Sequence, residues 1–157
     1  MGALSDTCTP HVPQTNGIAE NCVRKIKEGT ACCLAQSGLS YHFWDEATQC
    51  FAYSRNITDI LANGRTAYQN RFGNFKGHFI PFGALVHYMP IEEGQVVREH
   101  PIGPKTRDGI FMGYAARKGG SWSGDYLVLD AEKLHNADYV QQCQLLRYKA
   151  VSYTHLR

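Results

Sequence analysis

One carboxylate and two basic side chains share a face of a helix that the sequence predicts near its start. Glu20 is followed by Arg24 and Lys27. At roughly 100° per residue, these two lie about 40° and about 20° from Glu20 around the helix axis. The simplest interpretation is a solvated charged face with an ion pair between Glu20 and Arg24. The alternative is phosphoryl chemistry, in which the carboxylate binds a hard divalent cation and the bases contact nucleic-acid phosphates.

A constrained loop precedes this helix. Pro10 and Pro13 fix two backbone angles, and Thr15 or Asn16 can cap the helix. In a two-metal mechanism, the ions bracket the attacking and leaving oxygens of an in-line displacement. Carboxylates in fixed positions must hold these ions, and Glu20 on a rigid helix supplies one of them. Two further acids therefore have to come from elsewhere.

Helical periodicity runs through three segments of the first half of the chain. The first helix is predicted to start near Gly17 and to stop at Gln36-Ser37-Gly38, with Gly38 just beyond its end, and the third runs from Thr66 to Phe72. Ser40 can cap the second helix, which lies between them. The apolar residues expected on the buried faces are Ile18, Cys22, Ile26 and Cys33 in the first helix and Phe43, Trp44, Ala47 and Phe51 in the second.

Strand patterns follow after Gly77. Short apolar or alternating runs, bounded by Gly, Pro and Asp, predict strands at residues 84–89, 109–115 and 126–130, with a fourth candidate at 137–143. Helices followed by strands indicate an α+β protein of two units. We place the boundary between residues 74 and 81, so the predicted domains are 1–76 and 77–150.

Bulk composition limits the class of protein. Apolar residues make up 43% of the 157 residues and charged residues 19%, which suits a packed core. No signal peptide is visible and no apolar run approaches the roughly eighteen residues that cross a membrane, so we expect no membrane partner. The net charge is only +2, but residues 60–91 contain no acid, so the middle of the chain is locally basic.

The six cysteines show neither a C-x-x-C pair nor zinc-binding spacing. Four of them lie in helical, half-apolar stretches. We expect these four to be small core residues of a protein in a reducing compartment. They are Cys22, Cys32, Cys33 and Cys50.

The segment from Thr9 to Glu20, T-P-x-x-P-Q-x-N-G-I-A-E, resembles the last catalytic motif of integrases of the Ty1/copia class of retrotransposons. Further matches follow in the same order, up to about residue 131. They are Gly38-Leu39, Phe43-Trp44-x-Glu46-Ala47, Arg55-Asn56, Thr66-Ala67-Tyr68, Phe82-Gly83-Ala84, Gly109 to Tyr114 and Tyr126 to Asp130. The resemblance implies the helical back portion of a ribonuclease-H-like integrase core, followed by a small SH3-like β-barrel.

By this resemblance, Glu20 is the third acid of a D,D,E triad that binds Mg²⁺ or Mn²⁺ in the complete enzyme. Arg24 and Lys27 would then contact DNA, and the family uses such a site to cut and join DNA 3′ ends. The resemblance also implies a nuclear location, assembly into homo-oligomers and no small-molecule substrate. Arg117 and Lys118 are further candidates for contacts to nucleic acid.

Two interpretations of Trp122 stay open. It follows a Gly-Gly pair and lies near Arg117 and Lys118, where an aromatic ring can stack on a base. It can equally close one end of the predicted barrel.

The sequence also departs from the family pattern. The family's first two aspartates lie upstream on sheet strands, whereas Asp6 is the sole acid before Glu20. Asn21 and Val23 stand where the family usually has Arg and Asn. We therefore expect an incomplete core that binds no metal tightly and exposes the apolar side chains that the absent sheet would cover. Those side chains are Ile18, Ile26, Trp44 and Phe51.

The sequence thus predicts a fragment of a retrotransposon integrase that retains sequence-independent binding of nucleic acid. Two alternatives stay open: a non-catalytic nucleic-acid-binding module that uses residues 78–150 alone, and an inert remnant of the element. Residues 151–157 resemble a peptide produced when sequencing-adapter read-through is translated, and we expect them to be a non-native tail.

We expect the purified chain to join no DNA ends in Mg²⁺ or Mn²⁺, because a single carboxylate cannot hold the two ions. A strand-transfer assay with labelled duplex ends measures this. Turnover by the wild-type chain that is abolished in Glu20→Gln would contradict the prediction.

Overall fold

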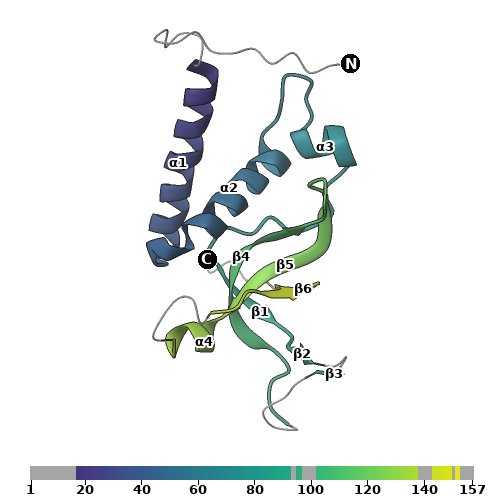
Figure 1. The fold of residues 1–157 in the computed structure, drawn as a ribbon. Helices are drawn as coiled ribbons and strands as arrows, with labels where there is room; N and C mark the ends of the chain where they lie inside the picture. Colours follow the sequence, from purple (N-terminus) through teal and green to yellow (C-terminus); the bar gives the residue numbers. More distant parts are fainter. Residues whose placement is uncertain (1–16, 93–94, 97–101, 138–142, 150, 153–157) are drawn as a thin grey trace.

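The computed structural model describes residues 17–92, 95–96, 102–137, 143–149 and 151–152. Helices come first and a sheet follows, which confirms the α+β class (Figure 1). Helix α1 (Gly17–Ser37) is followed by a single 3₁₀ turn, η2 (Tyr41–Phe43), which leads into α2 (Trp44–Thr58). The short helices α3 (Ala67–Phe72) and α4 (Ala131–His135) come later in the chain.

The end of α1 and the start of α3 follow the capping residues of the sequence, whereas Ser40 caps the turn η2 and not α2. Gly38 ends α1 with a φ of 68°, and its N–H donates to the Leu34 carbonyl at 3.1 Å. At the start of α3, the Thr66 hydroxyl accepts from the Gln69 N–H while the Gln69 side chain accepts from the Thr66 N–H. This reciprocal capping box, absent from the sequence prediction, fixes a helix of only six residues.

The main sheet is antiparallel, with strand order β6-β5-β4-β1-β7. Its strands are β1 (Leu85–Tyr88), β4 (Arg107–Ala116), β5 (Trp122–Asp130), β6 (Leu146–Tyr148) and β7 (Val151–Ser152). A separate hairpin pairs β2 (Ile91–Glu92) with β3 (Gln95–Val96). Three of the predicted runs coincide with β1, β4 and β5, whereas most of the fourth, 137–143, lies outside the described residues. Strand β7 falls in the predicted tail and pairs with β1.

The long β4–β5 hairpin curves because its pairing is irregular. The register shifts between Phe111 and Gly113 and again between Tyr114 and Ala116. Such bulges bend a strand and increase its twist. The hairpin tip consequently lies beneath α3 (Figure 1), where the Trp122 N–H donates to the Tyr68 hydroxyl at 3.2 Å.

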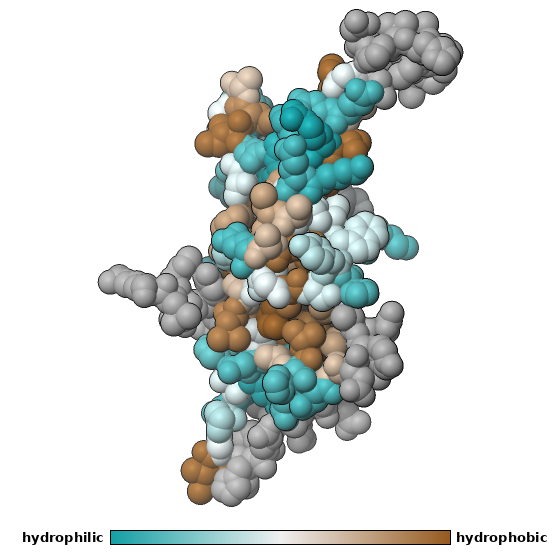
Figure 2. All heavy atoms as spheres, turned by 90° about the vertical axis from the view of Figure 1, so that its left-hand side faces the viewer, coloured by the Kyte–Doolittle hydropathy of each residue, from teal (hydrophilic) through white to brown (hydrophobic). Residues whose placement is uncertain are grey.

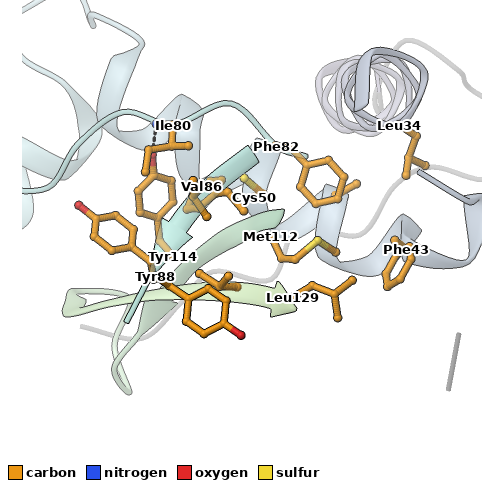
Figure 3. Close-up of a cluster of buried hydrophobic side chains, with 14 residues drawn as sticks. Leu34, Phe43, Cys50, Ile80, Phe82, Val86, Tyr88, Met112, Tyr114 and Leu129 are labelled. Atoms are coloured by element: carbon orange, nitrogen blue, oxygen red, sulfur yellow. Dashed lines mark hydrogen bonds between the residues drawn. The ribbon is translucent and has the colours of Figure 1, made fainter. Parts of the chain in front are cut away.

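A single buried cluster joins the helices to the sheet (Figure 3). On the helical side, Leu34 comes from α1, Phe43 from η2, and Ala47 and Cys50 from α2. The sheet and the loop before it contribute Ile80, Phe82, Val86, Tyr88, Phe111, Met112, Tyr114, Tyr126, Val128 and Leu129. The core is thus continuous across the predicted boundary between residues 74 and 81.

Helix α1 packs on α2 through its second half only. Thr30 and Leu34 are its buried residues, and the Thr30 and Thr48 hydroxyls lie 3.0 Å apart. Every residue from 17 to 25 is exposed. The prediction that Ile18 and Cys22 lie on a buried face was therefore wrong, because periodicity gives the apolar side of a helix but not how much of its length a neighbour covers.

The expectation for the cysteines also fails in part. Cys50 is buried against the sheet, and this burial raises the pKa of its thiol to about 12. Cys33 is half-buried, while Cys22 and Cys32 are exposed. Cys22 lies in the uncovered first half of α1, whereas Cys32 lies in the packed half but on a face turned to solvent.

Asp130 is the N-cap of α4, a helix that the sequence analysis did not predict. Its carboxylate is buried and accepts from the N–H groups of Glu132 and Lys133 and from the Tyr88 hydroxyl. Burial by itself would raise the pKa of Asp130, but these hydrogen bonds outweigh it and hold the pKa below its usual range. The strand-to-helix turn is therefore fixed by a charged cap.

Gly29→Ala should lower the free energy of unfolding by about 1–3 kcal/mol, as overpacking does. A Cβ at this position would lie 2.0 Å from Cζ of Phe51 on α2. Helix propensity alone would favour alanine by about 1 kcal/mol. Urea unfolding monitored by circular dichroism measures the difference.

Gly17→Ala is the control, because nothing lies within 4 Å of the Cβ it would add. Combining Gly29→Ala with Phe51→Ala should remove most of the overpacking penalty. Full additivity of the two changes would show that Gly29 and Phe51 do not oppose each other.

Candidate nucleic-acid interface

Glu20 lies in the first turn of α1 with an exposed side chain. Arg24 does not pair with it. The Arg24 guanidinium instead donates to the Asn21 side chain at 3.0 Å and lies 3.8 Å from the Glu28 carboxylate. Within the described ranges, no residue forms an ion pair or hydrogen bond with the Glu20 carboxylate, so the simple picture of a Glu20–Arg24 pair does not hold.

The structure brings the three predicted residues of α1 together. Glu20, Arg24 and Lys27 line one open hollow of about 440 Å³, along with Ala19, Val23 and Glu28. Two cations and two carboxylates thus meet there, and the cations lie one and two turns beyond Glu20. The hollow is open and is lined by one face of a single helix, so it is not a deep small-molecule pocket.

In the described part of the chain, no group of three or more His, Cys, Asp or Glu side chains could hold a metal ion. Glu20 offers a hard carboxylate oxygen of the kind that Mg²⁺ and Mn²⁺ prefer. Its described neighbours add only the carboxylate of Glu28 to the same hollow, beside two cations. Glu20 can therefore supply one ligand of a metal site, but the described residues cannot supply the complete site.

An apolar groove adjoins the hollow, and Val23 and Lys27 line both. The groove measures about 570 Å³ and lies between α1 and the start of α2. Its remaining lining residues are Cys22, Ile26, Thr30, Ala31, Leu34, Tyr41, Trp44 and Thr48. From the α1 side, hydrophilic surface over the upper part of the molecule is bordered by hydrophobic atoms (Figure 2).

The exposure expected of an incomplete core is seen at Ile18 and Trp44, whose exposed fractions are 86% and 61%. The other expectation, that Trp44 lies on the buried face of its helix, is therefore wrong. Ile26 and Phe51 are half-buried, because α1 and α2 partly cover each other where Phe51 meets Gly29. An exposed tryptophan next to exposed Tyr41 is unusual on a water-facing helix start.

Arg117 and Lys118 belong to a different surface. They occupy the turn between β4 and β5, where the Arg117 N–H donates to the Ser121 carbonyl at 2.8 Å. Helix α2 separates this turn from α1 (Figure 1). The structure therefore does not bring Arg117 and Lys118 to Glu20.

Trp122 is half-buried and packs between the hairpin and the loop that carries Phe75. Its indole N–H donates to the Asp125 carbonyl at 2.8 Å. The ring centroid lies 5.0 Å from that of Phe75 and 5.2 Å from that of Tyr126. Of the two open interpretations, the geometry favours the structural one, in which Trp122 closes the end of the hairpin.

A further cleft lies between α2, α3 and the hairpin tip, and sequence reasoning missed it. It is lined by Tyr53, Asn56, Ala67, Tyr68, Arg71, Phe72, Ala116 and Gly120, and we call it the hairpin cleft. The sequence offered one indication of this cleft, because α3 lies in the segment 60–91, which contains no acidic residue. The contact between α3 and the hairpin could not be predicted from the sequence, because more than forty residues separate Tyr68 from Ala116.

No family model matches the chain, and no solved structure matches it. None of the helices in the described ranges is both long and apolar enough to span a membrane. The likeness to Ty1/copia integrases therefore remains an inference from the motifs.

Trp44→Ala should leave the free energy of unfolding within about 0.5 kcal/mol of wild type, because the side chain is mostly exposed. Trp122→Ala should lower it by about 3 kcal/mol, since it removes packed aromatic contacts and the bond to Asp125. Urea unfolding compares the two variants. Binding of an apolar fluorescent dye should fall only in Trp44→Ala, and equal destabilisation by both changes would contradict the assignment.

Proposed function

We propose that this chain is part of a DNA integrase of the Ty1/copia type, with Glu20 as one carboxylate of a divalent-metal site. The observation that carries the proposal is the first half of α1, which stands exposed and presents Glu20, Arg24 and Lys27 on one side. In the complete site, Mg²⁺ or Mn²⁺ would supply activation of the attacking oxygen and stabilisation of the leaving one.

The contribution of this chain would be positional and electrostatic. The rigid helix holds the Glu20 carboxylate at a fixed place, and the cations of Arg24 and Lys27 draw the phosphate backbone toward it. The ion pair between Arg24 and Glu28 is exposed and weak, so phosphates can compete for the guanidinium.

The apolar groove supports the proposal that the helices belong to a ribonuclease-H-like core. In a ribonuclease-H-like core, a sheet would cover this groove and bring further carboxylates to its edge, beside Glu20. Val23 and Lys27 line both the groove and the hollow, so a sheet seated in the groove would reach the acid. The strongly bent β4–β5 hairpin likewise suits the proposed SH3-like barrel.

A second candidate is a non-catalytic nucleic-acid-binding module. The observation that favours it is the exposed β4–β5 turn, which carries Arg117 and Lys118 away from the Glu20 surface. In this case, binding would depend on the hairpin and not on α1. Both candidates have DNA as the partner, and assembly into homo-oligomers belongs to the first.

Anisotropy of a labelled DNA duplex at several salt concentrations tests the proposal on the full chain. Arg24→Gln with Lys27→Gln should weaken binding and reduce the slope of log K against log salt by about 2, because each lost phosphate contact contributes about 0.9. Arg117→Gln with Lys118→Gln should have a smaller or equal effect.

Lys25→Gln with Lys105→Gln is the matched control, since it removes the same charge. Lys25 is exposed on α1 but lies about 140° from Glu20 around the helix. Loss of binding in the hairpin variant alone would favour the second candidate. Absence of salt-dependent binding by the wild-type chain would overturn both.

A further inference from the structure

The hairpin cleft has the dimensions of a site for one ring system. It encloses about 200 Å³, less than the roughly 300–1,000 Å³ of pockets that hold drug-sized ligands. Three elements far apart in sequence build it, namely α2, α3 and the β4–β5 hairpin. The bond from the Trp122 N–H to the Tyr68 hydroxyl fixes the hairpin against α3, so the cleft is preformed.

Aromatic side chains form the apolar part of its lining. The Tyr68 ring lies 6.1 Å from Tyr53 and 5.1 Å from Phe72, centroid to centroid. Tyr68 is buried, whereas the exposed fraction of Phe72 is 38%. Rings of this kind stack on nucleobases without regard to sequence, because every base has a π-face.

Polar groups complete the lining. The Asn56 amide offers both donors and an acceptor to the edge of a heterocycle. The Tyr53 hydroxyl is enclosed and has no hydrogen-bond partner of good geometry in the described ranges, and burial, with Tyr68 nearby, raises its pKa.

The charge around the cleft is positive. Arg71 lines it, with its guanidinium carbon 5.2 Å from the centroid of the Phe72 ring. Gly120, at the other wall, belongs to the same turn as exposed Arg117 and Lys118. Within the described ranges, no acidic residue lines this cleft. An anionic group attached to the ring would therefore be attracted to the rim.

We infer that the hairpin cleft binds one unpaired nucleotide of a single-stranded nucleic acid, with the base among the aromatic rings and its phosphates at Arg71 and the β4–β5 turn. The cleft is too small for a base pair, so a duplex would contact only its cationic rim. The inference rests on the proposed binding of nucleic acid, to which it adds a preference for single-stranded segments.

Ala67→Leu tests the inference, because Ala67 is exposed, lines the cleft and starts α3, where leucine is tolerated. Anisotropy of labelled dodecathymidylate with the full chain should show about tenfold weaker binding, the loss of one stacked base. Binding of a duplex should stay within about twofold of wild type. Ala35→Leu, at an exposed position of α1, should change neither.

Asn56→Ala is the second variant, and it should weaken single-strand binding about threefold without filling the cleft. Unchanged single-strand binding in both variants, with duplex binding intact, would overturn this inference and leave the proposed function standing. Absence of binding to either form would overturn both. Equal competition by free dTMP at the same nucleotide concentration would show a site for mononucleotides and would overturn the single-strand assignment.

Discussion

Helix α2 is held between two close neighbours, and the rest of the structure depends on this arrangement. Cys50 is buried against the sheet, where Gly113 of β4 lies next to it. The next residue, Phe51, points its ring at Gly29 of α1. Small residues at both contacts let the backbones approach closely, so α2 ties α1 to the sheet through one continuous core.

This arrangement leaves the N-terminal half of α1 without a packing partner in the described structure. Because α2 reaches only as far as the middle of α1, residues 17–25 stay exposed and an apolar groove opens beside them. Leaving a groove lined by Trp44, Tyr41 and Val23 in water is unfavourable. Glu20 lies at the edge of this surface, and a partner that covered the groove would meet the carboxylate.

The sheet makes a second surface on the other side of α2. The two bulges in the β4–β5 pairing curl the hairpin until it meets α3, and the Tyr68 hydroxyl accepts a backbone N–H there. The same curl places the Arg117–Lys118 turn beside the hairpin cleft. Basic groups that are scattered along the sequence thus separate into two regions, one on α1 and one at the hairpin.

The sequence by itself determined the helix boundaries near Gly38, Thr66 and Gly73 and the positions of β1, β4 and β5. Local chemistry decides these features, through capping, positive φ and alternation of apolar residues. It also determined that Glu20, Arg24 and Lys27 share a face, because helical geometry alone requires it. The tertiary structure decided which parts of each face are covered: Trp44 is exposed while Cys50 is buried, and Trp122 packs against Phe75 at the end of the hairpin. It also decided the hairpin cleft, since contacts between residues far apart in sequence depend on packing and on strand bending that no local pattern encodes.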